Sequence, residues 1–126
     1  MRRGLSIDFG GSWLLPRLIG MHKAKELALL GEIVDAREAE RIGLVNRVVA
    51  HAELGPQVAD WAERLASGPP LALAMTKRLL ATATSCGLAE ALEAEAIAQT
   101  VNIASDDTAE AIRAFFQKRA PSFKGR

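Results

Sequence analysis

The feature that most constrains the fold is a series of apolar repeats at helical spacing that begins near residue 52 and continues almost to the end of the chain. Breaks at 67–70 and 84–87 divide this series into long helices, expected over about 54–66, 71–85 and 88–104, before a closing helix that starts near Asp107. Amphipathic helices with hardly any sheet need an apolar surface to cover them. The inward face of the third helix is expected to consist of Leu88, Leu92, Ile97 and Val101.

Residues 1–50 combine short helices with segments of strand character. The expected helices cover 12–19, 22–30 and 36–42. The last of these follows the capping-box spacing of Asp35 and Glu38. The segment 44–49 is β-branched and apolar and is the best strand candidate, and 32–35 is a candidate for brief β pairing. The chain is therefore expected to be mainly α with minor β, divided into residues 1–50 and a helical region over 51–126.

The composition excludes several functional classes. Apolar residues make up 49% of the chain and charged residues 25%, a balance typical of a globular protein with a core. The net charge is +1 and the basic residues are dispersed, so we expect no nucleic-acid binding. No apolar run reaches the length of a transmembrane helix, so no membrane partner is expected. His22 and His51 lack a second ligand at metal spacing, which argues against a metal site.

The cysteine usage indicates a compartment. Cys86 is the single cysteine and cannot form an internal disulfide, which fits a reducing cytoplasm. Arg2 and Arg3 are not followed by the apolar stretch of a secretion signal, so we expect a cytoplasmic protein. Because no histidine or basic residue adjoins Cys86 in sequence, it is not a candidate nucleophile.

A glycine turn before the first expected helix carries a single acid. Asp8 precedes Gly10 and Gly11, and glycine permits both positive φ and the close approach of another group. A helix that begins at Ser12 directs its free N–H groups and the positive end of its dipole toward this turn. From these residues alone, Asp8 is either a general acid/base or a carboxylate that caps the helix or is solvated.

Four segments resemble the enoyl-CoA hydratase/isomerase (crotonase) family in their order and spacing. They are 4–20, 23–31, 39–49 and 110–119, the last followed by Pro121, Phe123 and Lys124. The resemblance extends nearly from end to end but covers only the C-terminal half of a typical member. It implies the C-terminal half of the α/β crotonase (ClpP/crotonase-like) spiral fold, including its helical trimerisation region.

The resemblance also implies a function in fatty acid metabolism. Family members act on an acyl-CoA thioester by acid/base chemistry, as hydratases (lyases) or isomerases, with an enolate stabilised in an oxyanion hole. Coenzyme A is then part of the substrate, and no separate cofactor is expected. The family's C-terminal helices carry trimer contacts, and trimers often pair into hexamers, so a homo-oligomer is expected of a complete protein.

The resemblance assigns a role to the glycine turn. Dienoyl-CoA isomerases and 4-chlorobenzoyl-CoA dehalogenases of this superfamily have a catalytic aspartate at the position that matches Asp8, whereas hydratases use two glutamates on elements that lie before Met1. Ile7 and Phe9 are candidates to bury Asp8 in part. Trp13, with Gly10 and Gly11, is a candidate lining of the acyl pocket. The alternatives are a core tryptophan and glycines that only permit the turn.

Phe115 and Lys118 form a second candidate site. They are three residues apart on the expected closing helix and hence on one face of it. An amine beside an aromatic ring suits a phosphate-bearing ligand that contains adenine. In the resembling family, residues at these positions contact the adenine nucleotide of CoA. The alternative is a core phenylalanine beside a solvated lysine, and Arg119 and Lys124 are expected in solvent.

The resemblance does not cover the N-terminal half of a typical family member, and this affects the expected activity. In the family, two backbone N–H groups from the N-terminal β-spiral form the oxyanion hole. Loss of one such donor costs about 10²–10³ in rate, and loss of both exceeds the roughly 10²–10⁴ that a positioned acid supplies. We therefore expect negligible turnover from the 126 residues alone. The alternative function is a non-catalytic oligomerisation module of a crotonase-like assembly.

Overall fold

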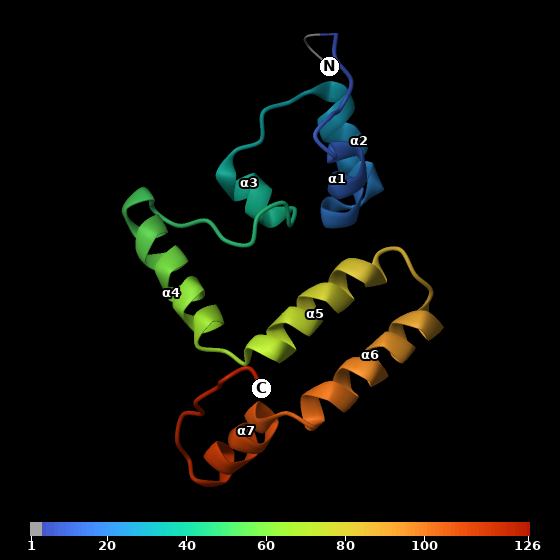
Figure 1. Ribbon diagram of the computed structural model, residues 1–126. Helices are drawn as coiled ribbons and strands as arrows, with labels where there is room; N and C mark the ends of the chain where they lie inside the picture. The colour runs from blue at the N-terminus through green and yellow to red at the C-terminus, as the bar shows by residue number, and fades with distance from the viewer. Residues whose placement is uncertain (1–3) are drawn as a thin grey trace. The chain divides into compact units, whose positions relative to one another are not determined.

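A computed structural model describes residues 4–126, which form seven α-helices, one 3₁₀-helix and no strand (Figure 1). The chain divides into two compact units, of which the first ends at Leu54 and the second covers Gly55–Arg126. The elements of the first part are α1 Gly11–Ile19, α2 Met21–Leu30, α3 Ala36–Arg41 and the 3₁₀-helix His51–Glu53. Those that follow are α4 Leu54–Ala66, α5 Pro70–Ala83, α6 Leu88–Ile103 and α7 Asp106–Phe116. The expectation based on Arg2 and Arg3 lies outside the described residues.

In the first unit, local signals set the helix ends. α1 and α2 pack against each other and are separated by Gly20, whose φ is 77°. α2 ends at Gly31, which is left-handed and donates its N–H to the Leu27 carbonyl at 3.0 Å. The predicted cap of α3 is confirmed, because the Asp35 carboxylate accepts the Glu38 N–H at 2.8 Å. These helices therefore begin and end within two residues of the sequence-based expectation.

The predicted strand at 44–49 is wrong. Instead, the chain turns back on the end of α3: the N–H groups of Leu44 and Val45 donate to the Ala39 carbonyl at 2.8 and 3.3 Å. The Val48 N–H donates to the Glu40 carboxylate at 2.9 Å. The brief pairing expected at 32–35 is also absent, and this segment links α2 to α3 without regular structure. A strand requires a neighbouring strand for its N–H and C=O groups, and residues 4–126 provide none.

In the second unit, α5 and α6 run side by side in opposite directions, joined by residues 84–87 (Figure 1). α6 is capped at its start by Glu90, whose carboxylate accepts the Gly87 N–H at 3.0 Å. α6 also contacts α7, which begins after Ser105. The Ser105 hydroxyl accepts the Thr108 N–H at 3.2 Å and so caps α7.

The C-terminal tail, residues 117–126, is attached to the first turns of α7. The Asp107 carboxylate accepts the N–H groups of Lys124 and Gly125 at 2.6 and 2.8 Å. The Asp106 N–H donates to the Arg126 carbonyl at 2.7 Å. Asp107 is only 5% exposed and is the single buried charged residue of the part that the structure describes. A buried carboxylate that accepts two backbone donors is well satisfied, so the tail is held at a defined place.

The buried core is small. Among the described residues, the buried hydrophobic side chains are Ala24, Ala39, Ala98 and Ala114. The prediction that 88, 92, 97 and 101 face inward is wrong for this chain, since these four side chains are exposed. Helix spacing establishes that their face is apolar, and within the second unit the contacts of α6 with α5 and α7 leave these side chains exposed.

Candidate functional site

The acid identified in the sequence lies in a tight turn. Asp8 is the first residue of the turn, and its carbonyl accepts the Gly11 N–H at 2.8 Å. The two central residues both have positive φ, 49° at Phe9 and 77° at Gly10, which is the type I′ arrangement. Gly10 adopts this conformation easily, whereas an aromatic residue does so at a cost of about 1–2 kcal/mol. Strain of this kind concentrates at functional sites, and here it adjoins Asp8.

The surroundings of Asp8 differ from the expectation. Asp8 is exposed, and Phe9 is 97% and Ile7 41% exposed, so the expected burial of the carboxylate by these neighbours is absent. Glycine is needed at position 11 because the Ile7 side chain lies close to its backbone: a Cβ at this position would lie 2.9 Å from that side chain. The turn therefore presents the Asp8 carboxylate at the surface of the first unit, directly before α1.

Trp13 lies in the first turn of α1 and is about half exposed, at 48%. The Arg17 guanidinium lies over its ring, 3.9 Å from the ring centroid, and also donates to the Trp13 carbonyl at 3.0 Å. This cation–π contact fixes the orientation of the indole. Within the described residues, Trp13 is therefore an oriented aromatic side chain that remains about half exposed.

The second candidate site lies at the end of α7. Helix α7 ends at Phe116, so Lys118 lies beyond the helix. The prediction that Phe115 and Lys118 share a helix face is therefore wrong. Lys118 instead has φ 52°, the left-handed conformation. Its N–H donates to the Phe115 carbonyl at 3.2 Å, and the Arg119 N–H donates to the Ala114 carbonyl at 3.1 Å. This pair of bonds is the Schellman motif, in which glycine usually occupies the position of Lys118.

The aromatic residues of this site are accessible. Phe115 is 79% exposed and forms an edge-to-face pair with Phe116, with ring centroids 5.8 Å apart. Such an aromatic pair contributes about 0.5–1.5 kcal/mol in addition to the stabilisation from the apolar area that it buries. Lys118 is exposed as well, so an amine and an aromatic ring both remain available to a ligand at this end of α7.

An acid on α7 holds the chain that follows Lys118. The Glu110 carboxylate accepts two hydrogen bonds from the Arg119 guanidinium, at 2.5 and 3.0 Å, and the Ser122 N–H at 3.2 Å. Arg119 is exposed, as expected, and its guanidinium is also paired with Glu110. The bonds from Arg119, and then that from Ser122, lower the pKa of Glu110 from its usual 4.5 to about 2.

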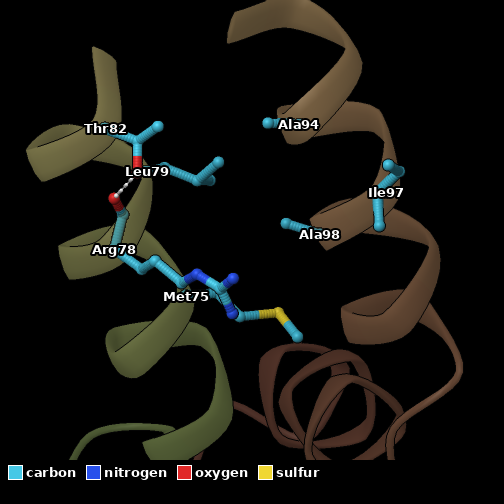
Figure 2. A pocket seen from close by; sticks show the side chains of 7 residues that line it. All are labelled: Met75, Arg78, Leu79, Thr82, Ala94, Ile97 and Ala98. Atoms are coloured by element: carbon cyan, nitrogen blue, oxygen red, sulfur yellow. Dashed lines mark hydrogen bonds between the residues drawn. The ribbon is translucent and has the colours of Figure 1, made fainter. Parts of the chain in front are cut away.

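An apolar groove of about 300 Å³ lies between α5 and α6 (Figure 2). It is lined by Met75, Arg78, Leu79, Thr82, Ala94, Ile97 and Ala98. Leu79 and Ala94 extend into it from opposite helices, as Figure 2 shows. None of the six residues predicted from the sequence lines this groove.

The structure thus places the six predicted residues in two local groups. Asp8, Gly10, Gly11 and Trp13 lie together at the start of α1 in the first unit, and Phe115 and Lys118 lie at the end of α7 in the second. Within residues 4–126, no group of three or more His, Cys, Asp or Glu side chains is placed to hold a metal ion.

The sequence reasoning missed the roles of two residues in these groups. Phe9 has the left-handed conformation beside Asp8, and the signal available was its place before two glycines, where a turn with two positive φ angles fits. Glu110 pairs with Arg119 across nine residues, a spacing that no helical periodicity indicates. Only the reversal of the chain after α7 brings these two side chains together.

Comparison with known proteins defines the class of fold. An enoyl-CoA hydratase structure from Bacillus anthracis superposes with a TM-score of 0.95 at 34% identity, and the match covers 99% of this chain and 48% of that one. The helices described above are therefore part of a crotonase-type fold. The sequence model of the enoyl-CoA hydratase/isomerase family matches residues 1–126, and the chain belongs to this family.

A hydratase and an isomerase resemble the chain to a similar degree. It is 38% identical over 120 residues to a crotonyl-CoA hydratase of Syntrophomonas wolfei, and covers 46% of that protein. It is 36% identical over 123 residues to a 1,2-epoxyphenylacetyl-CoA isomerase of Escherichia coli, and covers 47% of it. The chain thus spans about half the length of the curated relatives that it matches. No helix within residues 4–126 combines the length and apolarity needed to cross a membrane.

Proposed function

We propose that the chain is part of an acyl-CoA hydratase or isomerase of fatty acid metabolism, in which Asp8 is the general acid/base. The observation that carries the proposal is the family match over residues 1–126, together with the strained turn that presents Asp8 before α1. Names of both hydratases and isomerases occur among similar proteins, so the proposal covers both reactions.

The proposed chemistry uses the Asp8 carboxylate to move a proton at the carbon skeleton of the acyl group. Carboxylates in this role contribute about 10²–10⁴ in rate when they are within hydrogen-bond reach of the proton. Trp13 lies beside the turn and, in this proposal, supplies an oriented apolar wall for the acyl chain. Gly10 and Gly11 border the same site, where Gly11 leaves room for the Ile7 side chain. The thioester oxygen needs donors from another stretch of polypeptide, which the whole enzyme supplies in this proposal.

The proposed contacts to CoA lie at the end of α7. Lys118 presents a positive amine to a phosphate group, and Phe115 presents a ring to the adenine. Both side chains are exposed, and Phe115 is oriented by its contact with Phe116. We propose no separate cofactor, because CoA arrives with the substrate.

Titration of the 126-residue chain with CoA by calorimetry tests these contacts. We expect Lys118→Ala to weaken CoA binding about 10-fold, the equivalent of one charge-assisted hydrogen bond of about 1.5 kcal/mol. The matched control is Lys77→Ala, which removes an exposed lysine of α5 in the same unit. Equal affinity of the two variants would argue against the assignment of Lys118.

Complementation tests the role of Asp8. The 126 residues alone are expected to hydrate crotonyl-CoA at a negligible rate. Because the resembling hydratases carry their two glutamates before Met1, the role of Asp8 is tested in an isomerase reaction: addition of the N-terminal half of the Escherichia coli relative is expected to restore conversion of 1,2-epoxyphenylacetyl-CoA. Asp8→Asn should then lower the restored rate by about 10²-fold or more. Substantial turnover by the chain alone, or full restored activity with Asp8→Asn, would contradict the proposal.

A second candidate function is a non-catalytic assembly module that joins related subunits into trimers or hexamers. The exposed apolar side chains of the second unit favour it, since Leu80, Leu88 and Ile103 are 68%, 76% and 71% exposed. Sedimentation equilibrium separates the candidates: a trimer without CoA affinity favours the module, whereas CoA binding that is lost in Lys118→Ala favours the enzyme. A cytoplasmic location remains part of either proposal.

A further inference from the structure

The left-handed conformation of Lys118 calls for a physical cause. Its φ is 52°, at a helix-terminating position that glycine normally occupies because a Cβ is crowded there. A lysine does not reach this conformation by its own preference. Something outside the residue must stabilise it, and residues held in this way cluster at ligand-binding sites.

Besides the two backbone bonds of the Schellman motif, Arg119 makes side-chain hydrogen bonds on both sides of Lys118. Before Lys118, the Arg119 Nε donates to the Gln117 side-chain oxygen at 2.7 Å. After it, the same guanidinium donates to the Ala120 carbonyl at 3.0 Å. The Glu110 carboxylate anchors this guanidinium through two hydrogen bonds, and it also accepts the Ser122 N–H. We call this arrangement the Glu110–Arg119 clamp.

We propose that Glu110 is a positioning residue for the adenine nucleotide of the substrate: through Arg119 it holds Lys118 in the left-handed conformation that presents its amine beside Phe115. The inference rests on the proposed function and deepens it, because it names a residue that acts on CoA without contacting it. Glu110 lies one turn before Ala114 on α7, and its side chain is 15% exposed, so it faces the tail rather than a ligand.

The electrostatics fit a permanent clamp. The hydrogen bonds from Arg119 hold the pKa of Glu110 near 2, so the carboxylate stays ionised throughout the physiological range. Arg113 adds a second cation 3.4 Å from the same carboxylate. Lys118 itself is left free of the clamp, since the bonds around it involve only its backbone N–H. The clamp therefore fixes the backbone and leaves the amine available.

The first experiment measures the conformation without any ligand. The intraresidue HN–Hα NOE of Lys118, which is strongest at positive φ because the two hydrogens come closest there, and its three-bond HN–Hα coupling together report the sign and size of φ in the full 126-residue chain. We expect Glu110→Gln and Arg119→Ala to move both values away from the left-handed range. The control is Glu93→Gln, an exposed glutamate of α6, which should leave them unchanged. An unchanged Lys118 in Glu110→Gln would overturn the clamp.

The second experiment measures CoA affinity in a double-mutant cycle. In Glu110→Gln, Lys118 is released from its left-handed conformation, and a smaller fraction of the molecules then has Lys118 in the conformation that binds CoA. CoA binding should therefore weaken about 10-fold. The same substitution in the Lys118→Ala background should have no further effect, because the group that it positions is gone. A purely structural role would weaken binding by the same factor in both backgrounds, and that result would overturn the inference.

The outcomes separate this inference from the proposed function. If Lys118→Ala weakens CoA binding and Glu110→Gln does not, the contact of Lys118 with CoA stands and the positioning role of Glu110 is wrong. If the wild-type chain with an intact clamp does not bind CoA at all, the proposed ligand contact fails, and the ligand-positioning role fails with it. Weaker binding in Glu110→Gln alone, together with the changed coupling of Lys118, supports the inference.

Discussion

Replacement of Asp107 by asparagine tests how the C-terminal tail is held. The substitution keeps the size of the side chain but removes its charge and converts one of its two acceptor oxygens into a donor. In the native chain, these two oxygens accept the N–H groups of Lys124 and Gly125 at 2.6 and 2.8 Å. Asparagine can accept only one of them and places an NH₂ group against the other, in a site that is only 5% exposed.

The expected loss follows from two contributions. A hydrogen bond to an ionised acceptor contributes about 1.5–3 kcal/mol, and the amide left without an acceptor loses that contribution. Asp107 also lies in the first turn of α7, where a negative charge interacts with the helix dipole by about 0.3–1 kcal/mol. Together they predict that Asp107→Asn lowers the free energy of unfolding by about 2–4 kcal/mol.

Urea unfolding followed by circular dichroism measures this loss, and the adjacent acid is a matched control. Asp106→Asn removes a charge from the same helical turn, but the Asp106 side chain is exposed and forms only a 3.4 Å ion pair with Arg126. That substitution should cost at most about 1 kcal/mol, because exposed ion pairs contribute little. Equal losses of stability in the two variants would show that the buried Asp107 carboxylate does not hold the tail.

Three further predictions concern the turn, the helix end and the clamp. Gly10→Ala should destabilise the chain by about 1–2 kcal/mol in urea unfolding, because φ is 77° at this position; an unchanged midpoint would refute the turn assignment. Lys118→Gly should be more stable than Lys118→Ala by up to about 1 kcal/mol, since glycine relieves left-handed strain at some cost in chain entropy; the reverse order would contradict the Schellman motif. The stability that Glu110 contributes should persist above its usual pKa of 4.5 and be lost as the pH falls toward its folded pKa of about 2. A pH titration of unfolding should therefore show the wild type converging with Glu110→Gln in that range, and a constant difference would show that the pKa is not lowered.

Much of the helical structure follows from local sequence. Gly20 and Gly31 end α1 and α2 because glycine adopts the positive φ that terminates a helix there. Asp35 caps α3 because its carboxylate reaches the N–H three residues on. Each of these signals acts within four residues, so the local sequence alone is enough to place these helix ends. The family assignment also came from the sequence, since the resembling segments lie in order along nearly the whole chain and the family match covers residues 1–126.

The strand at 44–49 fails as a prediction for a physical reason. β-branched residues favour extended backbone, but a strand is stabilised by a partner that lies elsewhere in the chain. Here the N–H of Val48 is satisfied by Glu40 and that of Leu44 by Ala39, both of which lie within ten residues. Local composition therefore indicated the conformational preference of the segment but not whether a partner strand is present.

The sequence by itself determined the helices, their ends, the family and the identity of the candidate residues, because these depend on contacts between near neighbours or on residue order. Only the tertiary structure decided that Asp107 and Glu110 hold the tail, that Lys118 lies beyond the helix in a left-handed conformation, and that the apolar faces of the second unit are exposed. These features depend on where the chain reverses after α7 and on which surfaces meet. No periodicity along one helix contains that information, because the groups concerned become neighbours only when the tail folds back.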